Sequence, residues 1–276
     1  MDSRQETEII TSGGFGDTWK GKLHNGTTVV IKAWQKDMLQ QCNNKTLKRV
    51  ARKLFLWSRM DHPNIHRLQG VSLFRDWYLG VVSEWMDNGN LYQHLRKYPD
   101  ADRYQLCADV ASGLEYMHNC NTVHGDIKAI NILVSRDGIA QISDFDYSIL
   151  LEATSGLVFS VSSGNIRPAA VRWAAPELLN KQTQTKTTQS DVYALGMTML
   201  EIITGTFPFP GQEEVGVMLA VLGGAVPTRP TQLKEDEKGN MMWHMMPLCW
   251  SWDASDRPSS AQVANFRSRP SRCVHE

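Results

Sequence analysis

The pattern of apolar and polar positions predicts a β-rich region near the N-terminus that contains one helix. Residues 27–31 and 78–83 are runs of β-branched or apolar residues bounded by Gly, Asn and Asp, which is typical of strands. Between the two runs, apolar residues recur at three- and four-residue steps, and residues 61–64 interrupt the pattern. The apolar positions of this predicted helix are Leu47, Val50, Leu54 and Trp57, together with Ala51 and Met60.

A helical region is predicted to follow residues 87–90, which are rich in turn formers. Residues 104–118 carry one apolar face, formed by Leu106, Val110, Leu114 and Met117. A second helix is predicted from Asp191 to Ile203, because Gly205 and Pro208 follow it directly. Weaker helical signals continue towards the C-terminus. A β-rich part followed by a helical part indicates an α+β fold.

Charge and cysteine content narrow the function classes. The 276 residues include 29 Lys and Arg and 29 Asp and Glu, so no net charge draws the chain to nucleic acid or to an acidic membrane. Five cysteines without a CxxC pair argue against a disulfide framework or a zinc site, and predict a reducing, cytoplasmic location. No apolar run reaches the roughly 18 residues of a membrane span, so we expect no membrane insertion.

The most specific pattern is the set of acidic and amide residues at 124–131 and 144–146. The first segment reads His-Gly-Asp-Ile-Lys-Ala-Ile-Asn, the second Asp-Phe-Asp, and Ala-Pro-Glu follows at 175–177. Phosphoryl transfer needs a carboxylate that accepts the hydroxyl proton, and oxygen ligands for a metal ion close to it. Any one of these residues alone is equally consistent with a turn cap. The combination predicts a phosphotransferase.

With these motifs the chain resembles the catalytic domain of eukaryotic protein kinases over nearly its whole length. The His-Gly-Asp form of the loop and Trp-Ala-Ala-Pro-Glu are similar to tyrosine-kinase-like serine/threonine kinases, of the kind abundant in fungi. The resemblance implies one bilobal kinase domain over residues 1–276. The N-lobe is expected at 1–83, the hinge at 84–90, the C-lobe at 91–276, and the activation segment at about 144–177.

The resemblance also implies a role for each motif residue. Asp126 is expected to be the catalytic base, and Lys128 to steady the transferred phosphoryl group in the manner of serine/threonine kinases. Asn131 and Asp144 are expected to bind Mg²⁺. Glu177 and Arg257 are expected to form a buried ion pair, and Asp191 to brace the catalytic loop. Trp57, Leu68, His124 and Phe145 match four stacked side chains that couple the lobes.

ATP is the implied cofactor, and a protein is the implied second substrate or partner. A glycine-rich turn, formed by Gly13, Gly14 and Gly16, is expected to cover the phosphates, although an ordinary hairpin is an alternative reading. Lys32 resembles the lysine of the third strand that contacts phosphate, with a surface lysine as the alternative. The backbone from Glu84 to Met86 is expected to face adenine, with Ser83 as a small gatekeeper.

Several residues depart from the kinase pattern. Lys53 stands where the family has a glutamate that pairs with the strand lysine, and residues 38–60 contain no acidic residue. Asp146 replaces a glycine, and Ala170 replaces a threonine that hydrogen-bonds to the catalytic loop. Two hypotheses therefore remain: an active Mg·ATP-dependent protein serine/threonine kinase, and a pseudokinase that binds nucleotide or proteins without turnover.

The predicted small-lobe helix is also strongly basic. A solvated face and a docking site for an acidic or phosphorylated partner both explain this composition. The basic residues are Lys45, Lys48, Arg49, Arg52, Lys53 and Arg59.

Overall fold

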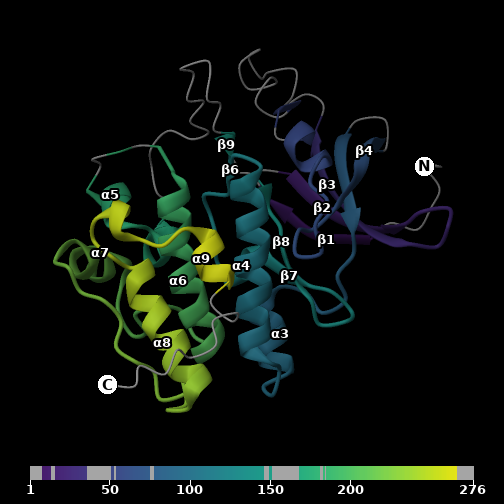
Figure 1. The fold of residues 1–276 in the computed structure, drawn as a ribbon. Coiled ribbons are helices and arrows are strands. Elements are labelled where there is room, and N and C mark those ends of the chain that lie inside the picture. The colour runs from purple at the N-terminus through teal and green to yellow at the C-terminus, as the bar shows by residue number, and fades with distance from the viewer. Residues whose placement is uncertain are drawn as a thin grey trace. The chain divides into compact units, whose positions relative to one another are not determined.

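The chain forms two compact units, Met1–Asp87 and Asn88–Glu276, each described here by itself (Figure 1). A computed structural model describes residues 8–13, 16–35, 51–52, 54–74, 78–145, 149–150, 168–180, 183 and 185–265. The first unit is a β-sheet with a helical segment, and the second is mainly helical, as the α+β prediction requires.

The first unit is built on one antiparallel sheet with the strand order β1-β2-β3-β5-β4. Its strands are β1 (Glu8–Gly13), β2 (Gly16–Lys22), β3 (Thr28–Gln35), β4 (Leu68–Phe74) and β5 (Tyr78–Glu84). Alternate apolar residues bury one side of these strands, because successive side chains of a strand point to opposite faces. Trp19, Val29, Ile31, Ala33 and Val82 form this core. Both strands predicted from the sequence are confirmed in β3 and β5.

A helical segment of the first unit covers residues 51–52 and 54–58, which confirms the C-terminal part of the predicted helix. The N-terminal part of that prediction lies outside the described residues. Trp57 donates a hydrogen bond from its indole Nε1 to the carbonyl of His66 at 2.6 Å, which ties the end of the helical segment to the chain that leads into β4.

The helices of the second unit are centred on α4 and α6. The α-helices are α3 (Leu91–Lys97), α4 (Arg103–Asn119), α5 (Pro176–Leu179), α6 (Thr188–Thr204), α7 (Glu214–Leu222), α8 (Glu237–Cys249) and α9 (Ser260–Ala264). The helices predicted at residues 104–118 and 191–203 are confirmed in α4 and α6. Nearly every residue of α6 is buried, so this helix forms the centre of the unit. It begins with a capping box between Thr187 and Ser190 and ends at Gly205, whose φ of 73° is readily adopted by glycine.

Short strands and 3₁₀ turns lie between the helices of the second unit. The strands β6 (Thr122–Val123) and β9 (Ile149–Leu150) pair with each other, and β7 (Ile132–Val134) pairs with β8 (Ala140–Ile142). The 3₁₀ turns are η1 (Ala129–Asn131), η3 (Pro168–Trp173) and η4 (Ala254–Asp256). The β7–β8 hairpin therefore lies between Asn131 and Asp144. In the described part of the chain, no helix is long and apolar enough to cross a membrane.

A buried ion pair connects α5 with the chain after η4. The guanidinium of Arg257 donates to Glu177 in a bidentate arrangement, with Nη1 to Oε1 at 2.7 Å and Nη2 to Oε2 at 2.8 Å. The carbonyls of Ser251 and Gln189 accept further hydrogen bonds from the same guanidinium. A buried charge is tolerated when it is paired and hydrogen-bonded in this way. The predicted Glu177–Arg257 pair is confirmed.

Candidate active site

Asp126 and Lys128, in the loop between β6 and η1, come together with Asn131, the last residue of η1. Lys128 Nζ lies 2.9 Å from Asp126 Oδ2, and the Nδ2 group of Asn131 donates to the same oxygen at 2.8 Å. Asn131 Nδ2 also donates to the Asp126 carbonyl at 2.8 Å. Both donors therefore hold one carboxylate oxygen. Within the described part of the chain, Asp126 Oδ1 accepts no hydrogen bond and is open to an incoming proton donor.

The side-chain amide of Asn131 is fixed in orientation. Both of its contacts are oxygen atoms of Asp126, which only accept hydrogen bonds, so the nitrogen of the amide must face them. The amide oxygen then points away from Asp126. No hydrogen bond to this oxygen comes from the residues described by the structure. An amide oxygen is a suitable ligand for Mg²⁺.

His124 and Ser143 connect the loop with the chain that leads to Asp144. His124 Nδ1 accepts a hydrogen bond from the backbone N–H of Asp126 at 3.1 Å, so the ring proton is on Nε2, which donates to the Ser143 carbonyl at 2.9 Å. The backbone N–H and the hydroxyl of Ser143 both donate to the Asn131 carbonyl, at 3.0 and 2.9 Å. The two predicted metal ligands, Asn131 and Asp144, are therefore held through one intervening serine.

Asp144 itself has an unusual backbone conformation, with φ at 62°. Aspartate tolerates the left-handed region better than most residues, but the conformation still costs free energy and occurs frequently at functional sites. The next residue, Phe145, packs edge-on against the buried ring of His124, with ring centroids 5.8 Å apart. Two of the four residues of the predicted stack are therefore in contact. Trp57 and Leu68 belong to the first unit, and their place in the stack stays a prediction.

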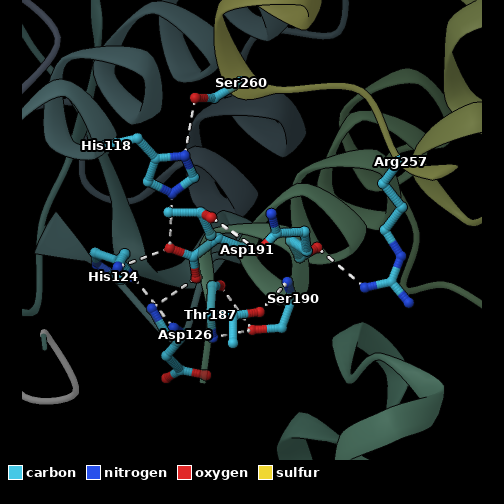
Figure 2. Close-up of polar contacts among 11 residues, drawn as sticks. His118, His124, Asp126, Thr187, Ser190, Asp191, Arg257 and Ser260 are labelled. Atoms are coloured by element: carbon cyan, nitrogen blue, oxygen red, sulfur yellow. Dashed lines mark hydrogen bonds and ion pairs between the residues drawn. The ribbon is translucent and has the colours of Figure 1, made fainter. Parts of the chain in front are cut away.

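Asp191, in the first turn of α6, holds the start of the catalytic loop (Figure 2). Its Oδ2 accepts from the backbone N–H of His124 at 2.7 Å, and its Oδ1 accepts from the N–H of Gly125 at 2.7 Å. Figure 2 also shows the ring of His118 beside this carboxylate, with Nε2 donating to Oδ2 at 3.1 Å. The predicted bracing role of Asp191 is confirmed.

Glu201 supports the same loop from the far end of α6. Its Oε2 accepts from the backbone N–H of Ala129 at 3.0 Å and from the indole of Trp173 at 3.1 Å. The side chain is 1% exposed, and Oε1 has no hydrogen-bond partner among the described residues. Burial raises the pKa of Glu201 from 4.5 to about 7, while the two hydrogen bonds and the Lys128 charge act in the opposite direction.

The amino-acid sequence was compared with those of protein families and of known proteins. The sequence profile of the family described as "Protein tyrosine and serine/threonine kinase" matches residues 5–266. The chain belongs to this kinase family. It is 28% identical to "Tyrosine-protein kinase Fer" of Homo sapiens over 93% of the chain, and 31% identical to a probable serine/threonine-protein kinase of Dictyostelium discoideum over 93%. It is 29% identical to "Mitogen-activated protein kinase kinase kinase 1a" of Physcomitrium patens over 94%.

The kinase domain accounts for only part of these relatives. The chain spans 30%, 27% and 32% of the length of the three proteins. The protein kinase fold and the protein kinase family predicted from the motifs are confirmed. Because the relatives include tyrosine kinases as well as serine/threonine kinases, the family does not fix which hydroxyl group is phosphorylated.

The nucleotide residues predicted for the first unit lie on its sheet. Gly13 and Gly16 are paired at the end of the β1–β2 hairpin, and Lys32 lies on β3 opposite Thr18 and Val81. Glu84 ends β5 and is exposed, whereas Ser83 and Met86 are buried. The roles of these residues towards ATP stay predictions.

Some predicted positions lie outside the described residues. They are Gly14, Asp146, Lys53 and three further members of the basic helix, Lys45, Lys48 and Arg49. The predicted conflict between Lys32 and Lys53 and the predicted basic docking face therefore stay hypotheses.

Four residues of the kinase site were not predicted from the sequence. Ser143 and Glu201 hydrogen-bond to the backbone of the catalytic loop, His118 contacts Asp191, and Lys186 donates to the Gly125 carbonyl. Ser143 could have been found, because it directly precedes the predicted ligand Asp144. The other three come from distant segments, and no local pattern marks them.

The raised pKa of Glu201 gives a prediction for stability. The folded state binds the Glu201 proton more tightly than the unfolded state does. The resulting stabilisation is present below about pH 4.5 and is lost as the pH rises through about 7. A Glu201→Gln variant lacks this titration. We expect its free energy of unfolding, relative to that of the wild type, to rise by about 2 kcal/mol between pH 5 and pH 8.

Urea unfolding at several pH values measures this difference. Glu213→Gln, which changes an exposed carboxyl group, is the matched control. The prediction would be wrong if the free energies of unfolding of Glu201→Gln and of the wild type differed by the same amount at pH 5 and at pH 8. Glu201 would then have the same pKa in the folded and the unfolded state.

Proposed function

We propose that this kinase domain is an active Mg·ATP-dependent protein serine/threonine kinase, which transfers the γ-phosphoryl group of ATP to a protein hydroxyl in signal transduction. The observation that carries the proposal is the arrangement at Asp126. Lys128 and Asn131 occupy one oxygen of its carboxylate, and the other oxygen is left to accept a proton. A carboxylate that is held at this distance from a lysine is suited to accept the hydroxyl proton as the phosphoryl group is transferred.

The other residues have distinct tasks in this proposal. Lys128 neutralises part of the phosphoryl charge, and its position two residues after the base favours serine or threonine over tyrosine. Lys32 and the backbone of Gly13, Gly14 and Gly16 bind the phosphates, and the backbone from Glu84 to Met86 binds adenine. His124, Ser143 and Asp191 hold the loop in shape, so that little reorganisation is needed when substrate binds.

Asn131 and Asp144 fit a magnesium site. The amide orientation of Asn131 leaves its oxygen available, and Asp144 supplies a carboxylate from the chain next to Ser143. Hard oxygen ligands of this kind are the ones that Mg²⁺ prefers. Magnesium, when bound, neutralises charge on the ATP phosphates.

The choice of hydroxyl group can be tested directly. We expect incubation with Mg·ATP and a mixed peptide library to give phosphoserine and phosphothreonine, measured by phosphoamino-acid analysis. Phosphotyrosine as the main product would contradict the assignment to serine and threonine while still showing kinase activity.

The pseudokinase reading has its own support, namely Lys53, Asp146 and Ala170 at positions where active relatives carry other residues. It predicts that Mg·ATP raises the melting temperature without any phosphate transfer. A domain that works only as a binding module would tolerate Asp126→Asn without loss of function.

A further inference from the structure

Two large apolar side chains are exposed near the catalytic loop. Ile130 directly precedes Asn131 in η1 and is 54% exposed, and Phe207, in the chain that follows α6, is 44% exposed. A single exposed apolar residue is common on a protein surface. Several that lie together beside an active site indicate an interaction surface.

A series of contacts connects the catalytic loop with Phe207. Glu201 Oε2 accepts from the backbone N–H of Ala129 at 3.0 Å and from the indole of Trp173 at 3.1 Å. The ring of Trp173 packs edge-on against the ring of Phe207, with centroids 5.8 Å apart. Phe207 is therefore held in place relative to the loop that carries Asp126.

The series of contacts continues from Phe207 to α3. The ring of Phe207 stacks on the ring of Tyr92, with centroids 5.3 Å apart and an angle of 9° between the planes. The guanidinium of Arg96, four residues further along α3, lies 5.7 Å from the centroid of the Tyr92 ring. Helix α3 also contacts η1, which contains Ile130. Ile130, Phe207, Tyr92 and Arg96 are together called the aromatic patch.

The charge around the aromatic patch is positive. Its segments are α3, η1, η3 and residues 205–212, and apart from the buried His94 their only ionisable side chains are basic: Arg96, Lys97 and Arg172. Arg172 donates to three carbonyls within residues 208–212. Arg96 is exposed and forms no ion pair with any described residue. Its guanidinium is therefore available to a carboxylate.

We propose that the aromatic patch binds the part of the protein substrate next to the phosphorylated hydroxyl, and that it selects an apolar residue followed by an acidic one. The proposal rests on the kinase function proposed above. Asn131 contacts Asp126, and Ile130 directly precedes Asn131, so the neighbours of a hydroxyl bound at Asp126 can reach the patch.

Each part of the patch favours one kind of substrate residue. An aliphatic or aromatic side chain that packs on Ile130 and Phe207 removes apolar surface from water on both sides. An aspartate or glutamate can form a charge-assisted hydrogen bond with Arg96, whereas a lysine or arginine would be repelled by it.

Peptides without a hydroxyl group can test this selection independently of turnover. The probes are fluorescein-labelled, alanine-based decapeptides that contain one leucine and one glutamate at varied spacing, and fluorescence anisotropy follows their binding to the kinase domain. We expect at least one spacing to bind with a Kd below about 1 mM. The same peptide with arginine in place of glutamate should bind at least about threefold more weakly.

Three variants locate the binding on the patch. Arg96→Glu should reverse the preference, so that the arginine peptide binds more tightly than the glutamate peptide. Lys97→Glu makes the same change of charge one residue further along α3, where Lys97 Nζ lies 5.1 Å from the centroid of the Tyr98 ring, and should keep the wild-type preference. Phe207→Ala should weaken binding of the leucine-containing peptide at least about threefold.

Binding and phosphate transfer separate this proposal from the kinase function. The selection is overturned if no peptide binds below about 1 mM, or if Arg96→Glu keeps the wild-type preference for glutamate. The expected preferences in the absence of any phosphate transfer to serine-containing versions of the peptides would support the patch and contradict the kinase function.

Discussion

An Asp126→Asn variant is expected to transfer phosphate about 10²–10⁴-fold more slowly than the wild type and yet to fold normally. The amide oxygen of asparagine can take the place of Oδ2 and accept from both Lys128 and Asn131. The open position is then occupied by an NH₂ group, which cannot accept a proton. We therefore expect the free energy of unfolding to change by less than about 1 kcal/mol. Initial rates with labelled ATP and urea unfolding measure the two effects.

Asp137→Asn is the matched control for this substitution. Asp137 is exposed at the tip of the β7–β8 hairpin, so its loss should change neither the rate nor the stability. If Asp126→Asn retained the wild-type rate, another group would have to be the base.

An Asp191→Asn variant should lose both stability and activity. Its carboxylate accepts from the backbone of His124 and Gly125 through different oxygens, so an amide in either orientation turns an NH₂ group towards a backbone N–H. We expect a loss of about 2–4 kcal/mol in the free energy of unfolding. The rate should fall about 100-fold, because Asp126 directly follows the released backbone and even a small misplacement of a catalytic group is costly.

Asp109→Asn provides the comparison for Asp191→Asn. Asp109 is also buried, and it accepts from the Gln105 side-chain amide and from the backbone N–H of Ala140. The Gln105 amide can rotate to present its oxygen, so asparagine can be accommodated there. The rate of the folded Asp109→Asn protein should equal that of the wild type. A folded Asp191→Asn protein with wild-type activity would mean that the loop does not depend on this brace.

The sequence predicted best where local patterns are strong. The periodicity of residues 104–118 and the stop signal at Gly205 located α4 and α6, because long amphipathic or capped segments carry their own information. The ion pair of Glu177 with Arg257 and the position of Asp191 followed from resemblance to kinases. Neither can be deduced from periodicity, since the paired residues are far apart in the chain.

The hydrogen bonds that hold the catalytic loop could not be predicted either, because their partners are far apart in the sequence. Glu201 reaches Ala129 across 72 positions, and a glutamate within the apolar sequence of α6 has no local signature that assigns it a partner. The amide orientation of Asn131 depends on oxygen atoms that only the folded loop brings together.

The most direct test of the proposed function is phosphate transfer from labelled ATP by the wild-type domain, to itself and to a generic basic substrate. The arrangement of Asp126, Lys128 and Asn131 predicts Mg²⁺-dependent incorporation of label. The absence of incorporation, under conditions where Mg·ATP raises the melting temperature of the same protein, would contradict an active kinase and favour a nucleotide-binding pseudokinase.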